Sequence, residues 1–276
     1  MNALVIGLGL IGGSFALALR DLEPATRVTG VDLRAVLDRA LARGAVDHAI
    51  ELDDTAAIER ACADADLVFL SAPVVAIRAM LPGVLARARV VTDCGSTKRA
   101  IVEHARSSAR FGRFVPGHPM AGAPDGGIDL ADANLFRGRR WLLCPEGSDA
   151  DAASFVETLV TRLGATPLRI GIDDHDRAVA LTSHVVQVVT SALAAVAEES
   201  GAELAAGPAF ERATRGAGGP EEIWGDILST NADAVAAGIA AVTRELSLVE
   251  AGLRLPKPDT GPARALLARA RRLRKG

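Results

Sequence analysis

The amino-acid sequence predicts an α/β protein, in which a doubly wound parallel sheet is followed by an all-helical C-terminal domain. From Met1 to about Ile172, short apolar runs alternate with amphipathic stretches of helical length. The runs are mostly apolar without alternation, as in parallel strands that helices cover on both faces. After Gly171 the sequence has no further strand pattern. We therefore expect two domains, over residues 1–172 and 173–276, with the boundary near 171–174.

The expected strands of the first domain are short apolar runs of four to six residues. They cover residues 3–7, 27–32, 66–71, 89–93, 113–116, 141–144 and 167–170. Helical stretches fall between most of them, for example at 11–21, 35–43 and 150–163.

The second domain is expected to consist of helices at residues 174–199, 208–215, 220–253 and 262–274. The first of these is apolar over most of its circumference, as in a helix that is buried within a bundle or against another subunit. The residues that make it so are Val185, Val186, Val188, Val189 and Leu193. Basic residues gather in the last helix, where they suit the negative end of its dipole and indicate a solvated helix end. They are Arg264, Arg269, Arg271, Arg272, Arg274 and Lys275.

Composition excludes several classes of protein. The 276 residues are 49% hydrophobic, enough for a sizeable core, and the net charge of −3 argues against a nucleic-acid partner. Cys62, Cys94 and Cys144 are far apart, which fits a reduced, cytoplasmic protein without disulfides or a metal site. No run of about 18 uninterrupted apolar residues and no signal peptide are found, so we expect a soluble protein with no membrane partner.

The glycines Gly7, Gly9 and Gly12 follow the first expected strand directly, and Leu10 and Ile11 open the first helix. This spacing gives a tight turn, a close backbone approach to a pyrophosphate, and a helix N-terminus that faces the phosphates. It is typical of a Rossmann-type dinucleotide site.

Asp32 ends the second strand about 20 residues after the turn, at the position where a carboxylate binds the adenosine ribose diol. It would repel a 2′-phosphate, so NAD is the expected cofactor, although Arg34 could turn toward such a phosphate. Ser71, Ala72 and Pro73 close a later strand at the same sheet edge, so we expect them near the nicotinamide.

Acid–base candidates follow by elimination. The chain has no tyrosine, and its lysines are Lys98, Lys257 and Lys275 alone, which leaves the five histidines. His118 lies between glycine and proline in the segment 117–122, which we expect to be a loop at the ligand-binding edge of the sheet. The acidic neighbours of His175 favour a helix-capping role, and His184 is either structural or a site residue. His48 and His104 have no motif around them.

Ser96 lies in the segment 93–98, which closes another strand at this edge. A serine here either caps the following helix, or orients His118 or binds a substrate hydroxyl.

Taken together, these motifs resemble the prephenate/arogenate dehydrogenase family over essentially the whole chain. The segments that carry the resemblance are Gly7–Gly12, Asp93-x-x-Ser96-x-Lys98, Gly117-His118-Pro119-Met120-Ala121-Gly122, Asn134-Leu135-Phe136, His175-Asp176, Ser183-His184, and Thr214-Arg215 followed by Trp224 and Asp226.

The resemblance implies NAD-dependent oxidative decarboxylation of a cyclohexadienol on the way to tyrosine. It implies that His118 takes the proton of the ring hydroxyl and that Ser96 orients His118 and the hydroxyl. Arg215 would bind a substrate carboxylate. Ser183, His184 and Trp224 would line the pocket, and the helical domain would form a homodimer.

Two positions depart from the family pattern. Gln187 stands where many members have a second histidine, and Pro124-Asp125 stands where many have a glutamate. Both positions would lie near the side chain that separates prephenate from arogenate. We expect a prephenate dehydrogenase, with arogenate dehydrogenase as the alternative. Less favoured are a carbonyl or imine reductase of the same architecture and a silent NAD-binding protein.

Overall fold

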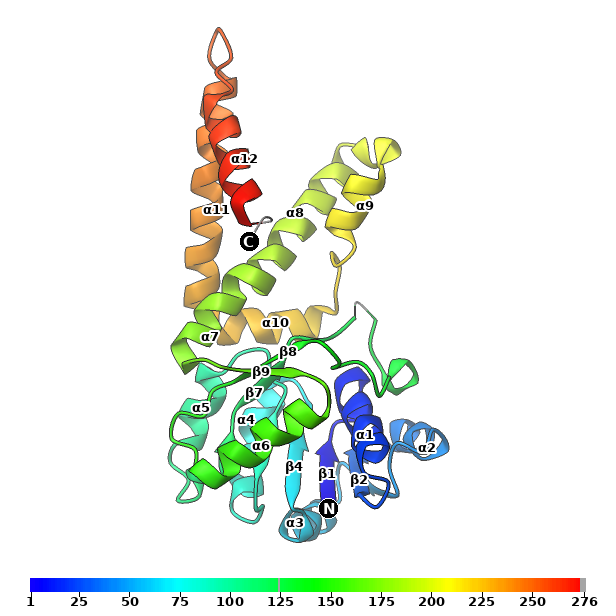
Figure 1. The fold of residues 1–276 in the computed structure, drawn as a ribbon. Helices are drawn as coiled ribbons and strands as arrows, with labels where there is room; N and C mark the ends of the chain where they lie inside the picture. Colours follow the sequence, from blue (N-terminus) through cyan, green and yellow to red (C-terminus); the bar gives the residue numbers. More distant parts are fainter. Residues whose placement is uncertain (124, 274–276) are drawn as a thin grey trace.

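The computed structural model describes residues 1–123 and 125–273, in which a sheet-containing body carries two projecting helical arms (Figure 1). The body contains six parallel strands in the order β3-β2-β1-β4-β5-β6. Their bounds are β1 Asn2–Ile6, β2 Arg27–Asp32, β3 His48–Glu51, β4 Leu67–Leu70, β5 Val91–Asp93 and β6 Phe114–Val115. The order reverses between β1 and β4, and ligands of open α/β sheets bind at the carboxyl ends of the strands beside such a reversal.

A second sheet, of mixed direction, lies beside the first. It consists of β7 Gly117–Pro119, β8 Arg140–Leu143 and β9 Thr166–Arg169. Strand β8 pairs antiparallel with β7 and parallel with β9. The runs at 141–144 and 167–170 therefore do not continue the parallel sheet, and the expectation of one doubly wound sheet is wrong for them.

Strands β3 and β7 were not expected from the sequence. Strand β3 is a mostly exposed edge strand, and β7 is three residues of glycine, histidine and proline, so neither has an apolar strand pattern. His48 is on β3, and His118 is on β7 rather than in a loop.

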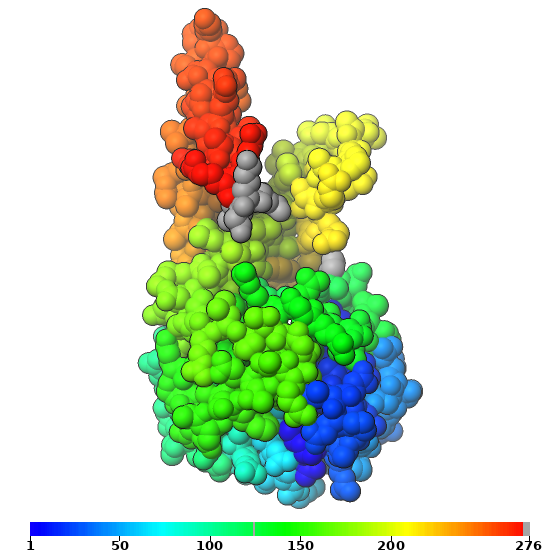
Figure 2. Space-filling model, viewed as in Figure 1, coloured from blue at the N-terminus to red at the C-terminus, as the bar shows by residue number. Residues whose placement is uncertain are grey.

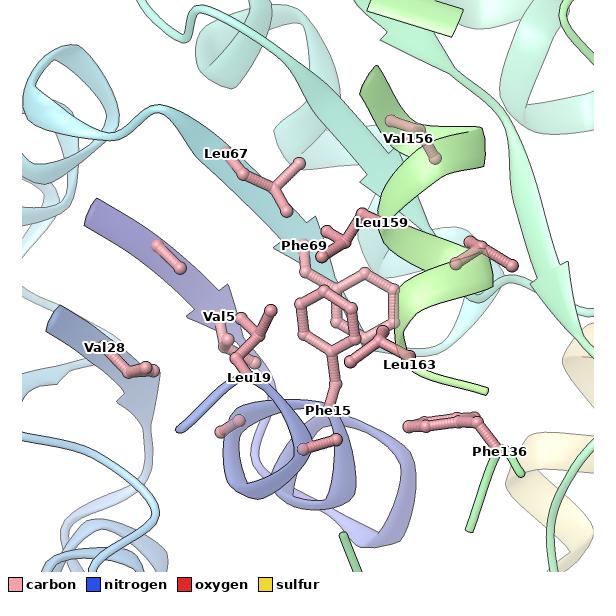
Figure 3. Close-up of a cluster of buried hydrophobic side chains, with 14 of the residues drawn as sticks. Val5, Phe15, Leu19, Val28, Leu67, Phe69, Phe136, Val156, Leu159 and Leu163 are labelled. Carbon is pink, nitrogen blue, oxygen red and sulfur yellow. The ribbon is translucent and has the colours of Figure 1, made fainter. Parts of the chain in front are cut away.

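Helices cover both faces of the large sheet. They are α1 Leu10–Leu22, α2 Arg34–Ala42, α3 Thr55–Asp64, α4 Val74–Leu85, α5 Arg99–Ala105 and α6 Ala150–Arg162, with the short 3-10 turns η1 Phe111–Arg113 and η2 Ile128–Leu130. The core between the sheet and helices α1 and α6 contains Phe15, whose ring stacks on Phe69 at a centroid distance of 4.0 Å (Figure 3). Leu159 of α6 belongs to the same cluster. This packing fixes α1, and with it the glycine turn at its start.

The C-terminal part is helical. Its elements are α7 Ile172–Val179, the π-helical turn η3 Ala180–His184, α8 Val185–Glu199, η4 Ala202–Ala205, α9 Pro208–Thr214, α10 Glu221–Thr230, α11 Ala232–Leu253 and α12 Gly261–Leu273. The helices expected at 174–199 and 220–253 are thus each interrupted, the first by the π turn and the second at Asn231. Pro124 of the departure from the family pattern, and Arg274 and Lys275 of the basic C-terminal cluster, lie outside the described residues.

Two arms, α8 with α9 and α11 with α12, stand clear of the body and diverge from each other (Figure 2). Apolar side chains along α8 face outward in the single chain, including Val186, Leu193 and Val196, the last 62% exposed. Residues Ile172–Glu199 form one helical run that is long and apolar enough to cross a membrane by length and composition. Helices that a protein partner covers have the same composition. The sequence predicts that this helix is buried, but within a single chain the apolar side chains of α8 stay largely exposed.

Candidate active site

The glycine turn between β1 and α1 brings three backbone segments into close contact. Gly7 has a φ of +90°, and a Cβ atom there would lie 2.0 Å from the carbonyl oxygen of Ser71. A Cβ atom on Gly12 would lie 1.9 Å from the carbonyl oxygen of Gly7. Gly9, the N-cap of α1, instead faces open space and gives that helix no side-chain cap. The backbone at Gly9, followed by Leu10 and Ile11, is therefore open to an anion.

Asp32 at the end of β2 is held beside this turn by two backbone amides. Its Oδ2 accepts a hydrogen bond from the N–H of Leu8 at 2.6 Å, and its Oδ1 accepts one from Leu33 at 2.7 Å. A fixed carboxylate next to a glycine turn suits the ribose diol of NAD.

Arg34 does not face a free phosphate position in this structure. Its guanidinium pairs with Asp38 at 3.0 Å and with Glu51 at 3.5 Å. These carboxylates partly neutralise Arg34, the cation that could favour NADP, which supports the expectation of NAD.

Ser71, Ala72 and Pro73 connect β4 to α4 at the same edge. The N–H of Ser71 donates to the carbonyl of Ile6 at 2.7 Å, so this loop is fixed against the glycine turn. The geometry of the two loops fits a dinucleotide at the carboxyl ends of β1, β2 and β4.

A buried ion pair fixes strand β7 against the end of β5. Lys98 and Asp93 are both fully buried and paired, and the Lys98 ammonium also donates to the carbonyl of Gly117 at 2.7 Å. Asp93 Oδ1 accepts the N–H of Gly117 at 2.9 Å. His118, the next residue, is thereby held at the carboxyl edge of the sheet. Lys98 thus has a structural role that was not expected from the sequence, because its ammonium positions this strand.

His118 is the first member of a chain of three side chains. Its Nδ1 lies 2.9 Å from Nε2 of His175, and Nδ1 of His175 lies 2.7 Å from Oδ1 of Asp176. Asp176 also accepts the N–H groups of Lys98 at 2.7 Å and Arg99 at 3.0 Å. The helix-capping role expected for His175 is wrong, because its ring is fully buried and bonded to His118 and Asp176.

These contacts determine where the ring protons lie. An ionised Asp176 only accepts, so His175 carries its proton on Nδ1 and accepts at Nε2. His118 must then donate from Nδ1, which leaves a lone pair on its Nε2. The bonds to His175 and to the two amides outweigh burial and lower the pKa of Asp176. Burial, followed by the nearby His175, Lys98 and His184, holds the pKa of His118 well below its ordinary 6.5. His118 is thus a neutral base at physiological pH.

Ser96 occupies the loop between β5 and α5 and is half-buried. Within the described residues no hydrogen bond joins Ser96 to His118, whose Nδ1 is bonded to His175 instead. His175 therefore orients the His118 ring at Nδ1, and an additional orienting role for Ser96 stays a prediction. A contact between Ser96 and a substrate hydroxyl stays a prediction.

The residues expected to line the pocket lie on η3, α8 and α10. His184 and Trp224 form an edge-to-face aromatic pair with ring centroids 6.3 Å apart. A Cβ atom on Gly219 would lie 2.4 Å from Trp224 Nε1 and 3.5 Å from Gln187 Nε2, so these side chains meet at the turn 216–219. Ser183 precedes His184 in the π turn, a feature frequent at functional sites. Arg215 is exposed at the end of α9, just before this turn, and no hydrogen bond of its side chain to a described residue is found.

Two sequence-family models match the chain. The prephenate dehydrogenase nucleotide-binding domain matches residues 15–168, and the prephenate dehydrogenase dimerization domain matches residues 172–259.

Individual relatives agree with these matches. A prephenate dehydrogenase from Lactococcus lactis is 30% identical over 93% of this chain and 72% of its own length. A cyclohexadienyl dehydrogenase from Zymomonas mobilis is 32% identical over 84% of this chain and 81% of its own length. A prephenate dehydrogenase from A. aeolicus, solved with hydroxyphenyl propionate and NAD+, has a TM-score of 0.86 at 24% identity, and the alignment covers 100% of this chain and 98% of that one. The similarity to this solved structure shows that the two proteins share a fold.

Proposed function

The chain belongs to the prephenate dehydrogenase family of oxidoreductases, and we propose that it converts prephenate and NAD+ into 4-hydroxyphenylpyruvate, CO2 and NADH. One observation supports this reaction independently of family membership. The chain His118–His175–Asp176 leaves a lone pair on Nε2 of His118, at the sheet edge that also holds the dinucleotide turn. A neutral base beside a hydride acceptor is what oxidation of an alcohol requires.

In the proposed reaction the ring hydroxyl of prephenate gives its proton to His118 Nε2. The positive charge that develops on His118 is stabilised through His175 by Asp176, which is ionised. NAD, when bound, supplies the hydride acceptor. As a hydride leaves the hydroxyl carbon, that carbon gains carbonyl character. The ring carboxylate then leaves as CO2, its bonding electrons complete the aromatic ring, and the ring oxygen takes back its proton from His118. Ser96 would bind the hydroxyl before the proton transfer.

Binding of the anionic substrate is assigned to the residues around the turn 216–219. Arg215 would pair with a carboxylate through its planar guanidinium. Ser183, His184, Gln187 and Trp224 would line the remainder of the pocket. Aromatic and amide groups in this arrangement suit a ring that bears a polar side chain.

Arogenate is the second candidate substrate, because Gln187 is neutral and its amide oxygen can accept from the arogenate ammonium. The contact of Gln187 with the turn 216–219 supports a place for it near the substrate side chain. A Gln187→His variant therefore tests the preference between prephenate and arogenate. It should change the ratio of kcat/KM between the two substrates and leave NAD affinity unchanged.

A soluble, cytoplasmic homodimer is part of the proposal. The outward apolar side chains of α8 lie within the stretch that matches the dimerization domain. A second copy of the chain would cover them and remove the apolar surface from water. Sedimentation of the wild type should give twice the monomer mass, and Leu193→Glu should weaken the dimer.

The function is tested by rates on prephenate and arogenate with NAD and with NADP, while NADH and CO2 are both measured. The proposal expects equal amounts of NADH and CO2 from prephenate with NAD. Turnover of simple ketones or imines without CO2 would instead favour a reductase, and NAD binding without any turnover would favour a silent binding protein.

A further inference from the structure

Asn231 occupies the break between α10 and α11 and has no part in the reaction described above. Its backbone is non-helical, with φ of −132° and ψ of 30°, and its side chain is 5% exposed. A buried amide at a helix break needs partners for its donors and its acceptor. The partners of the Asn231 Nδ2 group lie on α7 and in the π turn.

The contacts of the Asn231 amide fix its orientation. Its Nδ2 donates to the backbone carbonyl of Asp176 at 2.8 Å, and a carbonyl can only accept. The same Nδ2 lies 3.3 Å from Nδ1 of His184. Because that nitrogen of Asn231 is a donor, Nδ1 of His184 is the acceptor, and the single proton of a neutral His184 ring lies on Nε2.

The tautomer of His184 determines which of its ring nitrogens can donate a hydrogen bond to a ligand. It is 1% exposed, and burial lowers its pKa to about 4, so it is neutral at physiological pH. The described residues provide no hydrogen-bond partner for its Nε2, while its ring packs edge-to-face with Trp224. An N–H group is thus left for a ligand of this pocket.

We propose that Asn231 is a positioning residue that holds His184 in the Nε2–H tautomer, so that His184 donates a hydrogen bond to an oxygen of the anionic substrate. The identity of that substrate rests on the proposed function. His118 and His184 then have opposite roles, because His118 accepts at Nε2 and His184 donates there. Asp176 connects the two, since its carboxylate orients His175 and its carbonyl orients Asn231.

The competing account is that Asn231 only ties α11 to α7. The two accounts differ for Asn231→Asp, which has the same shape but accepts where the amide donated. At about pH 8.5, where the ring carries one proton, the carboxylate should draw that proton to Nδ1 of His184 and leave a lone pair on Nε2. Asn231→Ala removes the hydrogen-bond donor to His184 Nδ1 without introducing an acceptor in its place.

Tautomers are read directly from the ring 15N shifts in 1H–15N correlation spectra of histidine-labelled protein, with His184→Gln used to identify the His184 signals. We expect the proton on Nε2 in the wild type and on Nδ1 in Asn231→Asp. We also expect the substrate KM to rise about tenfold in Asn231→Asp and less in Asn231→Ala, with NAD affinity unchanged.

A wild-type spectrum with the proton on Nδ1 would overturn the proposal, and it decides the question even if no variant folds. A tautomer that moves without any change in KM would overturn the donor role, and equal KM changes in the two variants would favour the structural account. Because the wild-type spectrum needs no substrate, absence of turnover on prephenate and arogenate would reject the proposed function without altering the tautomer result.

Discussion

Nε2 of His175 lies 2.9 Å from Nδ1 of His118, although the two residues are 57 positions apart in the chain. One residue is on a short strand of the second sheet, and the other is on the first helix of the C-terminal part. The base and the group that orients it thus come from different parts of the molecule, and their contact depends on how those parts pack together.

The first prediction concerns this contact. His175→Leu removes the acceptor for Nδ1–H of His118, so the ring is free to adopt the wrong tautomer, and kcat should fall by about 10²-fold. His175→Gln presents an oxygen that can still accept, so its kcat should fall less. Steady-state kinetics with NAD and prephenate measures both. Equal losses in the two variants would mean that His175 acts only by filling space.

A second prediction concerns the acid limb of the profile of kcat/KM against pH. His118 acts as a base only when neutral, and burial with the neighbouring His175 and Lys98 keeps its pKa well below 6.5. Lowering the pH from 7.5 through 6.5 should therefore cost little kcat/KM, and the loss should begin at lower pH. An acid limb centred at 6.5 or above in the profile of kcat/KM would contradict this.

Stability should depend on pH through His184. Its pKa is about 4 in the fold against an ordinary 6.5, so the unfolded chain binds the proton first as the pH falls. The stabilisation is complete above about pH 6.5 and is lost as the pH falls through about 4, by an amount on the order of 3 kcal/mol. Urea unfolding at pH 7 and pH 4.5 measures the loss. The difference between wild type and His184→Gln isolates this residue from the carboxylates, and a constant difference would contradict the assignment.

Asp226 forms a helix cap between the two parts of the chain. Its Oδ2 accepts the N–H of Val75 at 3.0 Å, and the N-cap of α4, Pro73, has no side-chain donor or acceptor of its own. Asp226→Ala should therefore lower the free energy of unfolding by about 1 kcal/mol, a shift of roughly 2–4 °C in Tm. Asp226→Asn keeps an acceptor and should lose less. Calorimetry of the three proteins tests the cap, and an unchanged Tm in Asp226→Ala would show that it contributes nothing.

The dinucleotide half could be predicted from the sequence because its signals are local. Gly7, Gly9 and Gly12 are required by a turn of a few residues, and the position of Asp32 follows from one strand–helix–strand unit. His118 was found as a candidate by elimination, since the chain lacks tyrosine.

The second sheet and the orientation of His118 could not be predicted in the same way. Strand β7 pairs with β8 across more than twenty residues, and nothing in Gly117-His118-Pro119 has a strand pattern. His175 has acidic neighbours that also suit a helix start, so its sequence context favours capping until the packing of α7 against β7 is known. The role of the buried Lys98–Asp93 pair also depends on a contact distant in sequence, because both side chains bond the backbone of Gly117.

The assignment of His118 as the base is the central claim, and kcat of His118→Asn tests it most directly. Asparagine fills similar space but has no basic nitrogen, so kcat on prephenate should fall by ~10²–10⁴ while the Kd for NAD stays unchanged. His104→Asn, at an exposed position on α5, is the matched control and should keep wild-type kcat. A His118→Asn enzyme that turns over at nearly the wild-type rate would contradict the account.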